Sequence, residues 1–346
     1  MKNFFYFIII LALAILTVFA GRHDTDLFSG RKPVGKLTIY TSMYEGVIKS
    51  LDEVLKKQFP DCKIKFVYGG TSQIQARIAT EQGTGKLGCD ILLVAEPSYS
   101  LELKQKGLLH RYISCEAGNL AFGYDSEGYW YPVRVSAMVL AYNPEKNART
   151  SVPNSFFDFA NNAGFRGAIS MSNPLVSGTA LVAAAALKDK YGYSYFEALA
   201  KQKITIESSS IALSKLETGE YKAVMTLEES VLQKRQEEAS KLEVIYPTDG
   251  AVIIPSTIMT ITDKWSANNN IQSAEIITDW FLGPQGQNAI VAGWMHSVRK
   301  DFEVIPYASI PVGRMPTDGM PLNWESIFRQ REDIQIKFEE LVTYRR

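Results

Sequence analysis

The chain has 346 residues, of which 46% are apolar and 21% charged, a composition typical of an ordinary globular protein. Lysine plus arginine equals aspartate plus glutamate, at 37 each, so the formal net charge is zero. Because nucleic-acid-binding proteins usually carry a basic surplus or a basic stripe, this balance argues against nucleic acid as a partner. The apolar content is sufficient for two moderate cores rather than one.

The first twenty residues predict export from the cytoplasm. Lys2 precedes an apolar run from Phe4 to Ala20, which is the pattern of a secretory signal peptide cleaved after a small residue. The length of the run leaves an uncleaved membrane anchor as an alternative. Gly21 stands where a bacterial lipoprotein would need its lipid-bearing cysteine, so we expect no lipid anchor. Residues 1–20 are therefore expected to be a signal peptide, and the mature protein to be periplasmic.

Short apolar strands alternate with amphipathic helices over the next part of the chain. The third strand, Asp90–Ala95, has little polar interruption, as a buried parallel strand requires. Three strand–helix units in succession predict a parallel sheet with helices on both faces. In chain order, the predicted strands and helices are Lys36–Tyr40, Tyr44–Phe59, Lys63–Tyr68, Ser72–Glu81, Asp90–Ala95 and Leu101–Lys106.

A second α/β unit of typical domain size follows. Its predicted strands are Ala137–Asn143, Gly167–Met171, Lys222–Thr226 and Lys241–Tyr246, and its predicted helices are Ala180–Asp189, Tyr195–Lys201 and Glu228–Ser240. Beyond it, Ile253–Thr262 is extended and β-branched, and Ile271–Leu282 and Gln285–Ala292 have helical patterns. The chain ends in a long polar tail that is partly helical.

One pattern occurs three times: a strand ends, small hydroxyl or glycine residues follow, and a helix begins. The three places are Thr41-Ser42-Met43, Gly69-Gly70-Thr71-Ser72 and Ser177-Gly178-Thr179-Ala180. A helix N-terminus exposes backbone N–H groups and a partial positive charge, so it attracts anions. Each hydroxyl also has a simpler interpretation as a plain N-cap. The equivalent positions of all three favour an anion site formed by two lobes.

These segments resemble bacterial periplasmic solute-binding proteins of ABC importers, in the branch that takes iron, phosphonates and sugar phosphates. The resemblance extends over most of residues 36–299 and rests on the order of its motifs. They are Ile39-Tyr40-Thr41-Ser42-Met43-Tyr44-Glu45, Gly69-Gly70-Thr71-Ser72-Gln73, Cys89-Asp90-Ile91-Leu92, Glu96-Pro97-Ser98-Tyr99, Val139-Leu140-Ala141-Tyr142-Asn143-Pro144, Asn173-Pro174, Ser177-Gly178-Thr179-Ala180, Tyr246-Pro247-Thr248-Asp249-Gly250 and Gly283-Pro284-Gln285-Gly286-Gln287.

The resemblance implies a type II periplasmic-binding fold, an α/β architecture in which two lobes, each a mostly parallel sheet flanked by helices, are joined by two crossings. The crossings would lie near Tyr131–Ser136 and Pro247–Val252. Lobe 1 would then comprise residues 36–131 and 252–346, and lobe 2 residues 132–251. The implied partners are a membrane permease and an ATPase, and we expect a monomer without a cofactor.

The residues that match the family's binding segments favour a phosphorylated solute over iron. Ferric-binding members typically use a pair of adjacent tyrosines in the second lobe, whereas the helix after Met225 begins Thr226-Leu227-Glu228-Glu229-Ser230. Ferric iron stays the alternative. Arg134, near the first crossing, would either pair with an anion or brace the hinge. The expected ligand-binding residues are Thr41, Ser42, Met43, Gly70, Thr71, Glu96, Ser177, Gly178, Thr179 and Glu228, the two glutamates facing an ammonium or hydroxyl groups at the far end of the ligand.

Other classes of site find little support in the sequence. The chain has three cysteines, Cys62, Cys89 and Cys115, so at least one of them is unpaired. None of them has the spacing of a metal-binding motif. We expect buried free thiols, with one disulfide left open. No nucleophile elbow, P-loop, His-Glu-x-x-His or dinucleotide-binding glycine motif is present. A secreted two-carboxylate hydrolase is the remaining enzymatic alternative.

Overall fold

The computed structural model describes residues 31–316, 320 and 322–344. Within them nine strands form one sheet, in the order β2-β1-β3-β9-β4-β7-β5-β6, with β8 paired to β4. The strands are β1 (Gly35–Thr41), β2 (Cys62–Tyr68), β3 (Ile91–Val94), β4 (Tyr131–Tyr142), β5 (Ile169–Met171), β6 (Thr205–Ile206), β7 (Ala223–Leu227), β8 (Glu243–Ile245) and β9 (Val252–Thr260). β1–β3 pair in parallel, as do β5–β7, whereas β4 and β9 run antiparallel to their neighbours. The predicted α/β fold class is confirmed.

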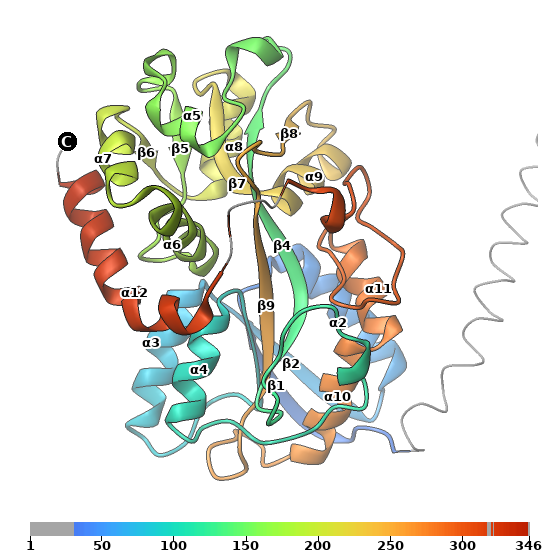
Figure 1. Cartoon of the computed structure of the whole chain (residues 1–346). Coiled ribbons are helices and arrows are strands. Elements are labelled where there is room, and N and C mark those ends of the chain that lie inside the picture. The colour runs from blue at the N-terminus through green and yellow to red at the C-terminus, as the bar shows by residue number, and fades with distance from the viewer. Residues whose placement is uncertain (1–30, 317–319, 321, 345–346) are drawn as a thin grey trace, which may run out of the picture.

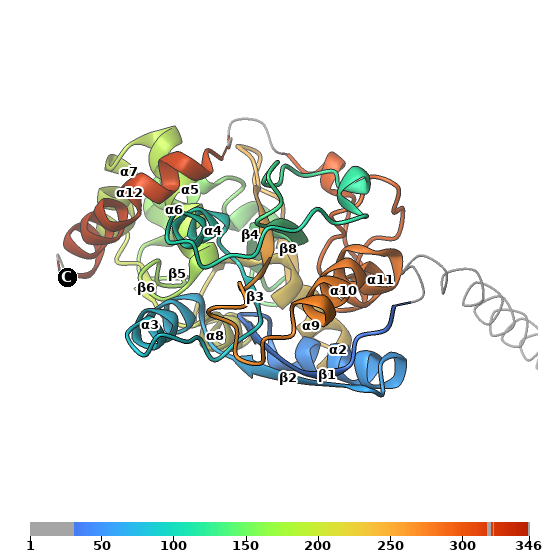
Figure 2. The ribbon, with the colours of Figure 1, turned by 90° about the horizontal axis from the view of Figure 1, so that it is seen from below.

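Helices cover both faces of this sheet (Figures 1 and 2). They are α2 (Glu45–Gln58), α3 (Thr71–Gln82), α4 (Pro97–Gln105), α5 (Phe156–Asn161), α6 (Gly178–Tyr191), α7 (Ser194–Lys201), α8 (Ser209–Thr218), α9 (Glu228–Glu237), α10 (Ile271–Leu282), α11 (Pro284–Ala292) and α12 (Trp324–Phe338). No helix in the described part of the chain is both long and apolar enough to cross a membrane. The expected signal peptide, residues 1–20, lies outside the described residues.

Two long strands join the lobes. β4 is buried along its whole length of 12 residues, and it pairs with β9 from Tyr131 opposite Ile258 to Met138 opposite Val252. Figure 1 shows both strands running from one lobe into the other. The sequence predicted a strand only from Ala137, because Pro132 and Arg134 interrupt the apolar pattern before it. The structure accommodates them with a bulge between Pro132 and Arg134, so the first crossing is part of the sheet.

Each lobe has its own apolar core. In lobe 1, α2, α10 and α11 pack on one face of β1–β3 and α3 and α4 on the other. In lobe 2 the core gathers around α6, whose residues from Gly178 to Leu187 are all buried. The run of alanines in α6 makes this burial possible, since small side chains let neighbouring elements approach closely. The apolar cores of the two lobes are therefore separate.

The C-terminal helix differs from expectation in its packing. The sequence placed residues 252–346 in lobe 1, but Ile327, Ile334 and Phe338 of α12 belong to the lobe 2 core. The ring of Phe338 meets Phe196 of α7 edge-on, with centroids 5.3 Å apart. On its other side, α12 reaches lobe 1 through α4. The helix therefore contacts both lobes, and its apolar face packs in the core of lobe 2.

Candidate functional site

A cavity of about 660 Å³ lies between the two lobes. Residues that follow the carboxyl ends of strands line it: Ser42 after β1, Gly70 after β2, Ala95 after β3, Ser172 after β5 and Glu207 after β6. In open α/β sheets, ligands bind beyond the carboxyl ends of the strands. The cavity therefore occupies the position at which this topology places a binding site.

The lobe 1 wall of the cavity carries Ser42, Gly70 and Thr71. Gly70 is the N-cap of α3, and its N–H is bonded by the side chain of Gln73, so Thr71 is not the cap of this helix. Tyr44 is the N-cap of α2, and the buried hydroxyl of Ser42 has no hydrogen-bond partner among the described residues. The capping interpretation therefore fails for Ser42 and Thr71, whose hydroxyls are available to a ligand.

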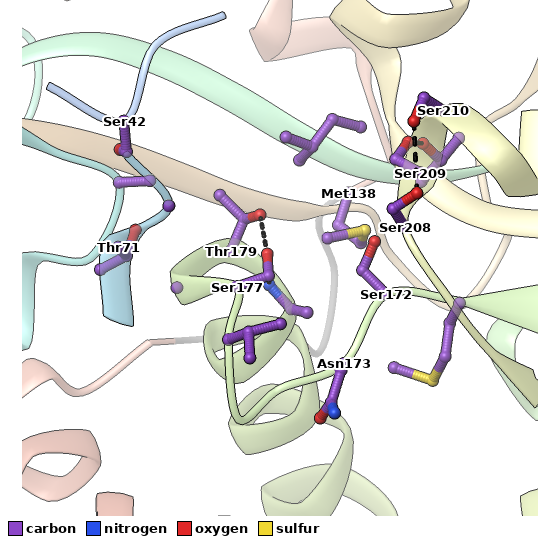
Figure 3. Close-up of a pocket in the computed structure, with 18 of the residues that line it drawn as sticks. Ser42, Thr71, Met138, Ser172, Asn173, Ser177, Thr179, Ser208, Ser209 and Ser210 are labelled. Atoms are coloured by element: carbon purple, nitrogen blue, oxygen red, sulfur yellow. Dashed lines mark hydrogen bonds between the residues drawn. The ribbon is translucent and has the colours of Figure 1, made fainter. Parts of the chain in front are cut away.

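The lobe 2 wall carries Ser177, Gly178 and Thr179 at the start of α6 (Figure 3). Here the capping interpretation holds for one residue, because the Ser177 hydroxyl accepts a hydrogen bond from the N–H of Ala180 at 3.3 Å. Thr179 Oγ1 lies 3.2 Å from Ser177 Oγ, so the two hydroxyls form a pair at the edge of the cavity. Six of the ten expected ligand-binding residues thus line one cavity.

Lobe 2 also supplies polar groups that the sequence analysis did not identify. Ser208, Ser209 and Ser210 begin α8, and Ser172 and Asn173 follow β5; all five line the cavity. Figure 3 shows them across the cavity from Ser42 and Thr71. The available signal was the serine run before Ala212, Leu213 and Leu216, an N-cap followed by apolar residues at helical spacing.

Four expected residues do not line the cavity. Thr41 and Met43 are buried beside Ser42, and Glu96 and Glu228 are buried beside the lining residues Ala95 and Leu227. Successive side chains along a strand point to opposite faces. Thr41 and Met43, on either side of Ser42, therefore turn away from the cavity, whereas Glu96 and Glu228 stand where the chain leaves its strand, at the N-cap of α4 and the first position of α9.

Glu228 is bound within a buried polar cluster instead. One carboxylate oxygen lies 2.7 Å from His296 Nε2, and the other accepts hydrogen bonds from Ser309 and Tyr246. His296 belongs to the C-terminal part of the chain and pairs with Val135 of the hinge strand β4. Glu228 and Tyr246 belong to lobe 2, so the cluster connects the two parts. Glu228 thus connects the C-terminal part of the chain to the start of α9. Both of its carboxylate oxygens have partners in this cluster, so neither is left for a ligand in the cavity.

Glu96 lies buried behind the cavity, where α12 meets lobe 1. Gln75 donates to its Oε2 at 3.3 Å, Arg331 Nη1 stands 3.9 Å from the same atom, and Oε1 has no partner among the described residues. Burial raises the pKa of this carboxyl to about 8, and the Arg331 guanidinium only partly opposes the shift. Glu96 is therefore expected to be protonated in the folded protein at neutral pH.

This protonation predicts a pH-dependent stability. The folded state holds the Glu96 proton up to about pH 8, whereas an unfolded glutamate loses it near its ordinary value of 4.5. The free energy of unfolding should therefore fall as pH rises between these values, by up to about 1.4 kcal/mol per pH unit. Glu96→Gln, which stays neutral, should flatten this part of the profile in thermal unfolding at pH 5 to 8. The exposed Glu145→Gln serves as control, and a wild-type slope retained in Glu96→Gln would contradict the assignment.

Arg134 is the one cationic side chain among the described residues that line the cavity. It is 3% exposed, it follows the bulge in β4, and its Nη1 donates to Met295 Sδ at 2.7 Å. Burial lowers the pKa of its guanidinium, and the nearby Glu229 carboxylate opposes that shift. Because an arginine keeps its proton in proteins, the hinge strand presents a buried positive charge to the cavity.

The two lobes touch at the rim of the cavity. A Cβ added to Gly178 of lobe 2 would lie 2.8 Å from Thr71 Oγ1 and 3.0 Å from Glu96 Cβ, both of lobe 1. Ser72 donates to the carbonyl of Leu175 at 2.8 Å, and the hydroxyls of Tyr44 and Ser230 are 2.9 Å apart. These contacts join the lobes around the cavity, so the structure is in a closed arrangement.

Solved structures with this fold bind chemically different solutes. The periplasmic binding protein AfuA from Actinobacillus pleuropneumoniae, with fructose 6-phosphate bound, superposes with a TM-score of 0.76 at 18% identity over 89% of this chain and 99% of that one. Iron-bound HitA from Pseudomonas aeruginosa gives 0.75 at 18% identity over 89% and 99%. A periplasmic thiamin binding protein gives 0.73 at 17% over 90% and 99%. At such identities the likeness establishes the fold alone.

The family comparison goes further. No curated protein sequence matches the chain. The family described as bacterial extracellular solute-binding protein matches residues 89–309, which include β3 through the hinge strands and most of the cavity wall. Two α/β lobes with a cavity between them are the structural counterpart of that match. The chain belongs to the bacterial extracellular solute-binding proteins.

Proposed function

We propose that this protein is the periplasmic substrate-binding component of an ABC importer specific for a small anionic solute. The solute is a phosphonate, a sugar phosphate or a related phosphorylated molecule, held between the lobes and delivered to a membrane permease that works with an ATPase. Because the structural neighbours bind fructose 6-phosphate, iron and thiamin, the fold does not select among them. The choice of an anion rests on the cavity.

One observation carries the proposal: helix N-termini and hydroxyl groups surround the cavity together with a buried cation. α3, α6 and α8 begin at the cavity wall, and first-turn amides have no partner within their helix. Each helix adds the positive end of its dipole, which favours an anion. Glu207, the one carboxylate among the described lining residues, is paired with Lys215 at 3.0 Å. The local field is therefore positive, with hydroxyl donors for several oxygens.

Ferric iron is the alternative ligand, and it requires other donor atoms than an anion does. Fe³⁺ is a hard cation that prefers phenolate and carboxylate oxygens. Tyr44 and Tyr68 are the phenols that line the cavity in the described structure. Burial, together with the nearby Glu229 carboxylate, raises the pKa of Tyr44 to about 12, so phenolate formation there is unfavourable. A cavity with Arg134 and three helix N-termini also repels a trivalent cation.

Removing single hydroxyls tests the anion site. Ser42→Ala and Thr179→Val should each weaken the binding of a phosphorylated probe by about ten- to a hundredfold, because a hydrogen bond to a charged group contributes about 1.5–3 kcal/mol. Their unfolding temperatures should stay near that of the wild type, since neither hydroxyl is the cap of its helix. Calorimetric titration of inorganic phosphate, methylphosphonate and fructose 6-phosphate, beside ferric citrate, gives both the ligand class and the affinities.

Ser155→Ala is the matched control. Ser155 caps α5 by accepting from the N–H of Asp158 at 2.9 Å, and it does not line the cavity. Losing this cap should cost about 1 kcal/mol of stability and leave the affinity intact. If Ser42→Ala and Thr179→Val behave like this control, the hydroxyls are structural and the anion site is refuted. Tight binding of ferric citrate with no response to phosphorylated probes would favour iron.

A further inference from the structure

An apolar floor runs under the polar walls of the cavity in lobe 2. Five side chains form it: Met138, Met171, Ile206, Met225 and Leu227. They come from four adjacent strands and are linked by register, since Met171 pairs with both Met225 and Ile206, and Met138 pairs with Leu227. Cross-strand partners point to the same face of a sheet. The register of these strands therefore places three thioethers and two branched alkyl groups side by side beneath the site.

This floor has few groups that a polyhydroxylated solute needs. A thioether sulfur is a weak acceptor, and alkyl groups offer none. A hydroxyl buried against such a surface loses its bonds to water without replacement, which is costly. The carboxylate of Glu207, which would accept from sugar hydroxyls, is bonded to Lys215. The donors at the helix N-termini suit an anionic head, whereas the floor itself offers only weak acceptors to the hydroxyls of a sugar ring.

The same floor suits a flat, polarisable body. Methionine is flexible and polarisable, and its sulfur makes favourable contacts with aromatic rings. Lobe 1 adds two aromatic side chains to the cavity, Tyr44 and Tyr68, and Tyr68 is 50% exposed, so its ring is free to contact a ligand. In the view of Figure 3, Met138 lies between Thr179 on one side and Ser208 and Ser172 on the other, so the apolar floor adjoins polar groups of the wall.

We propose that the solute is a phosphate or phosphonate carried on an aromatic or heteroaromatic ring, rather than on a sugar. The inference rests on the proposed anion-binding function and deepens it. The anionic head lies at the N-termini of α3 and α6, near Arg134, and the ring lies on the methionine floor. Ser172 and the α8 serines then bond to substituents on the ring. The cavity thus discriminates between phosphorylated solutes by the group that carries the phosphate or phosphonate, while the phosphate or phosphonate itself provides the charge.

Titration of the full mature chain with phenyl phosphate, benzyl phosphate, fructose 6-phosphate and inorganic phosphate tests this proposal. An aromatic phosphate should bind about tenfold or more tightly than fructose 6-phosphate or inorganic phosphate. Met225→Gln, similar in size but polar, should remove most of that preference, measured as the ratio of the affinities for the aromatic phosphate and for inorganic phosphate. Met225→Leu, which keeps an apolar surface of similar volume, should retain it.

The outcomes separate the two levels of the proposal. If phosphorylated probes bind but fructose 6-phosphate equals or exceeds the aromatic ones, the aromatic class is wrong and the anion function stands. The same holds if Met225→Gln leaves the preference intact. If no phosphorylated probe binds, the anion function fails and the ring assignment fails with it. The probe series is measured on the wild type first. The comparison of aromatic phosphates with fructose 6-phosphate therefore does not depend on whether a variant folds.

Discussion

Arg134→Gln is expected to weaken the binding of a phosphorylated solute by about a hundredfold. Arg134 is a buried cation that lines the cavity, and a charge-assisted hydrogen bond to an anion contributes about 1.5–3 kcal/mol. The change should also destabilise the protein, because it removes the positive charge that opposes the burial-raised pKa of the Glu229 carboxyl. Calorimetric titration and thermal unfolding measure the two effects separately.

The double variant Arg134→Gln with Glu229→Gln distinguishes binding from folding. Ser136 donates to Glu229 at 2.7 Å, and an amide at this position keeps an acceptor for that hydroxyl. With both charges removed, stability should return towards the wild-type value while the affinity stays low. If the double variant recovers the affinity as well, Arg134 braces the hinge and does not bind the anion.

Gly178→Val should abolish tight binding by preventing the lobes from closing. A Cβ at this position would lie 2.8 Å from Thr71 Oγ1, closer than real Cβ contacts allow, and the two further methyl groups of valine enlarge the clash. Since Thr71 and Gly178 belong to different lobes, the strain is relieved when the lobes separate rather than when either unfolds. We expect an affinity loss of more than about a hundredfold with little change in unfolding temperature.

Small-angle scattering with saturating solute provides the structural readout. The radius of gyration of the wild type should fall when ligand is added, whereas that of Gly178→Val should stay at the open value. Gly123→Val is the control, because Gly123 has an exposed position with no atom within 4 Å of an added Cβ. A Gly178→Val protein that binds and contracts like the wild type would show that the lobes do not meet here during binding.

The sequence predicted the strand ends well because they carry a strong local signal. Apolar runs followed by Ser, Thr or Gly and then by helical spacing located Ser42, Thr71 and Thr179, and all three line the cavity. It did not predict which side chains at each strand end face the cavity. Glu96 and Glu228 are one residue beyond the lining positions Ala95 and Leu227, where the chain turns into α4 and α9 and the period of the strand no longer predicts the direction of a side chain.

Other parts of the site depend on tertiary structure. β6 has two residues, too few for any periodic signal, so the serines that follow it had no predicted strand to mark them. Met138, Met171 and Met225 are far apart in the chain and read as ordinary core residues; only the register of β4, β7 and β5 brings them together. The cysteines illustrate the same limit, since Cys62 and Cys89 are buried thiols as expected but Cys115 is exposed.

The most direct test of the account is to identify the solute that the protein carries. The full-length chain would be produced with its own N-terminus, recovered from the periplasm and purified under native conditions, and then denatured. Mass spectrometry of the released small molecules should find a compound with a phosphate or phosphonate group, in about one-to-one ratio with protein. Stoichiometric ferric iron with a visible charge-transfer band, and no phosphorus in the released fraction, would contradict the central claim that the cavity binds a phosphorylated anion.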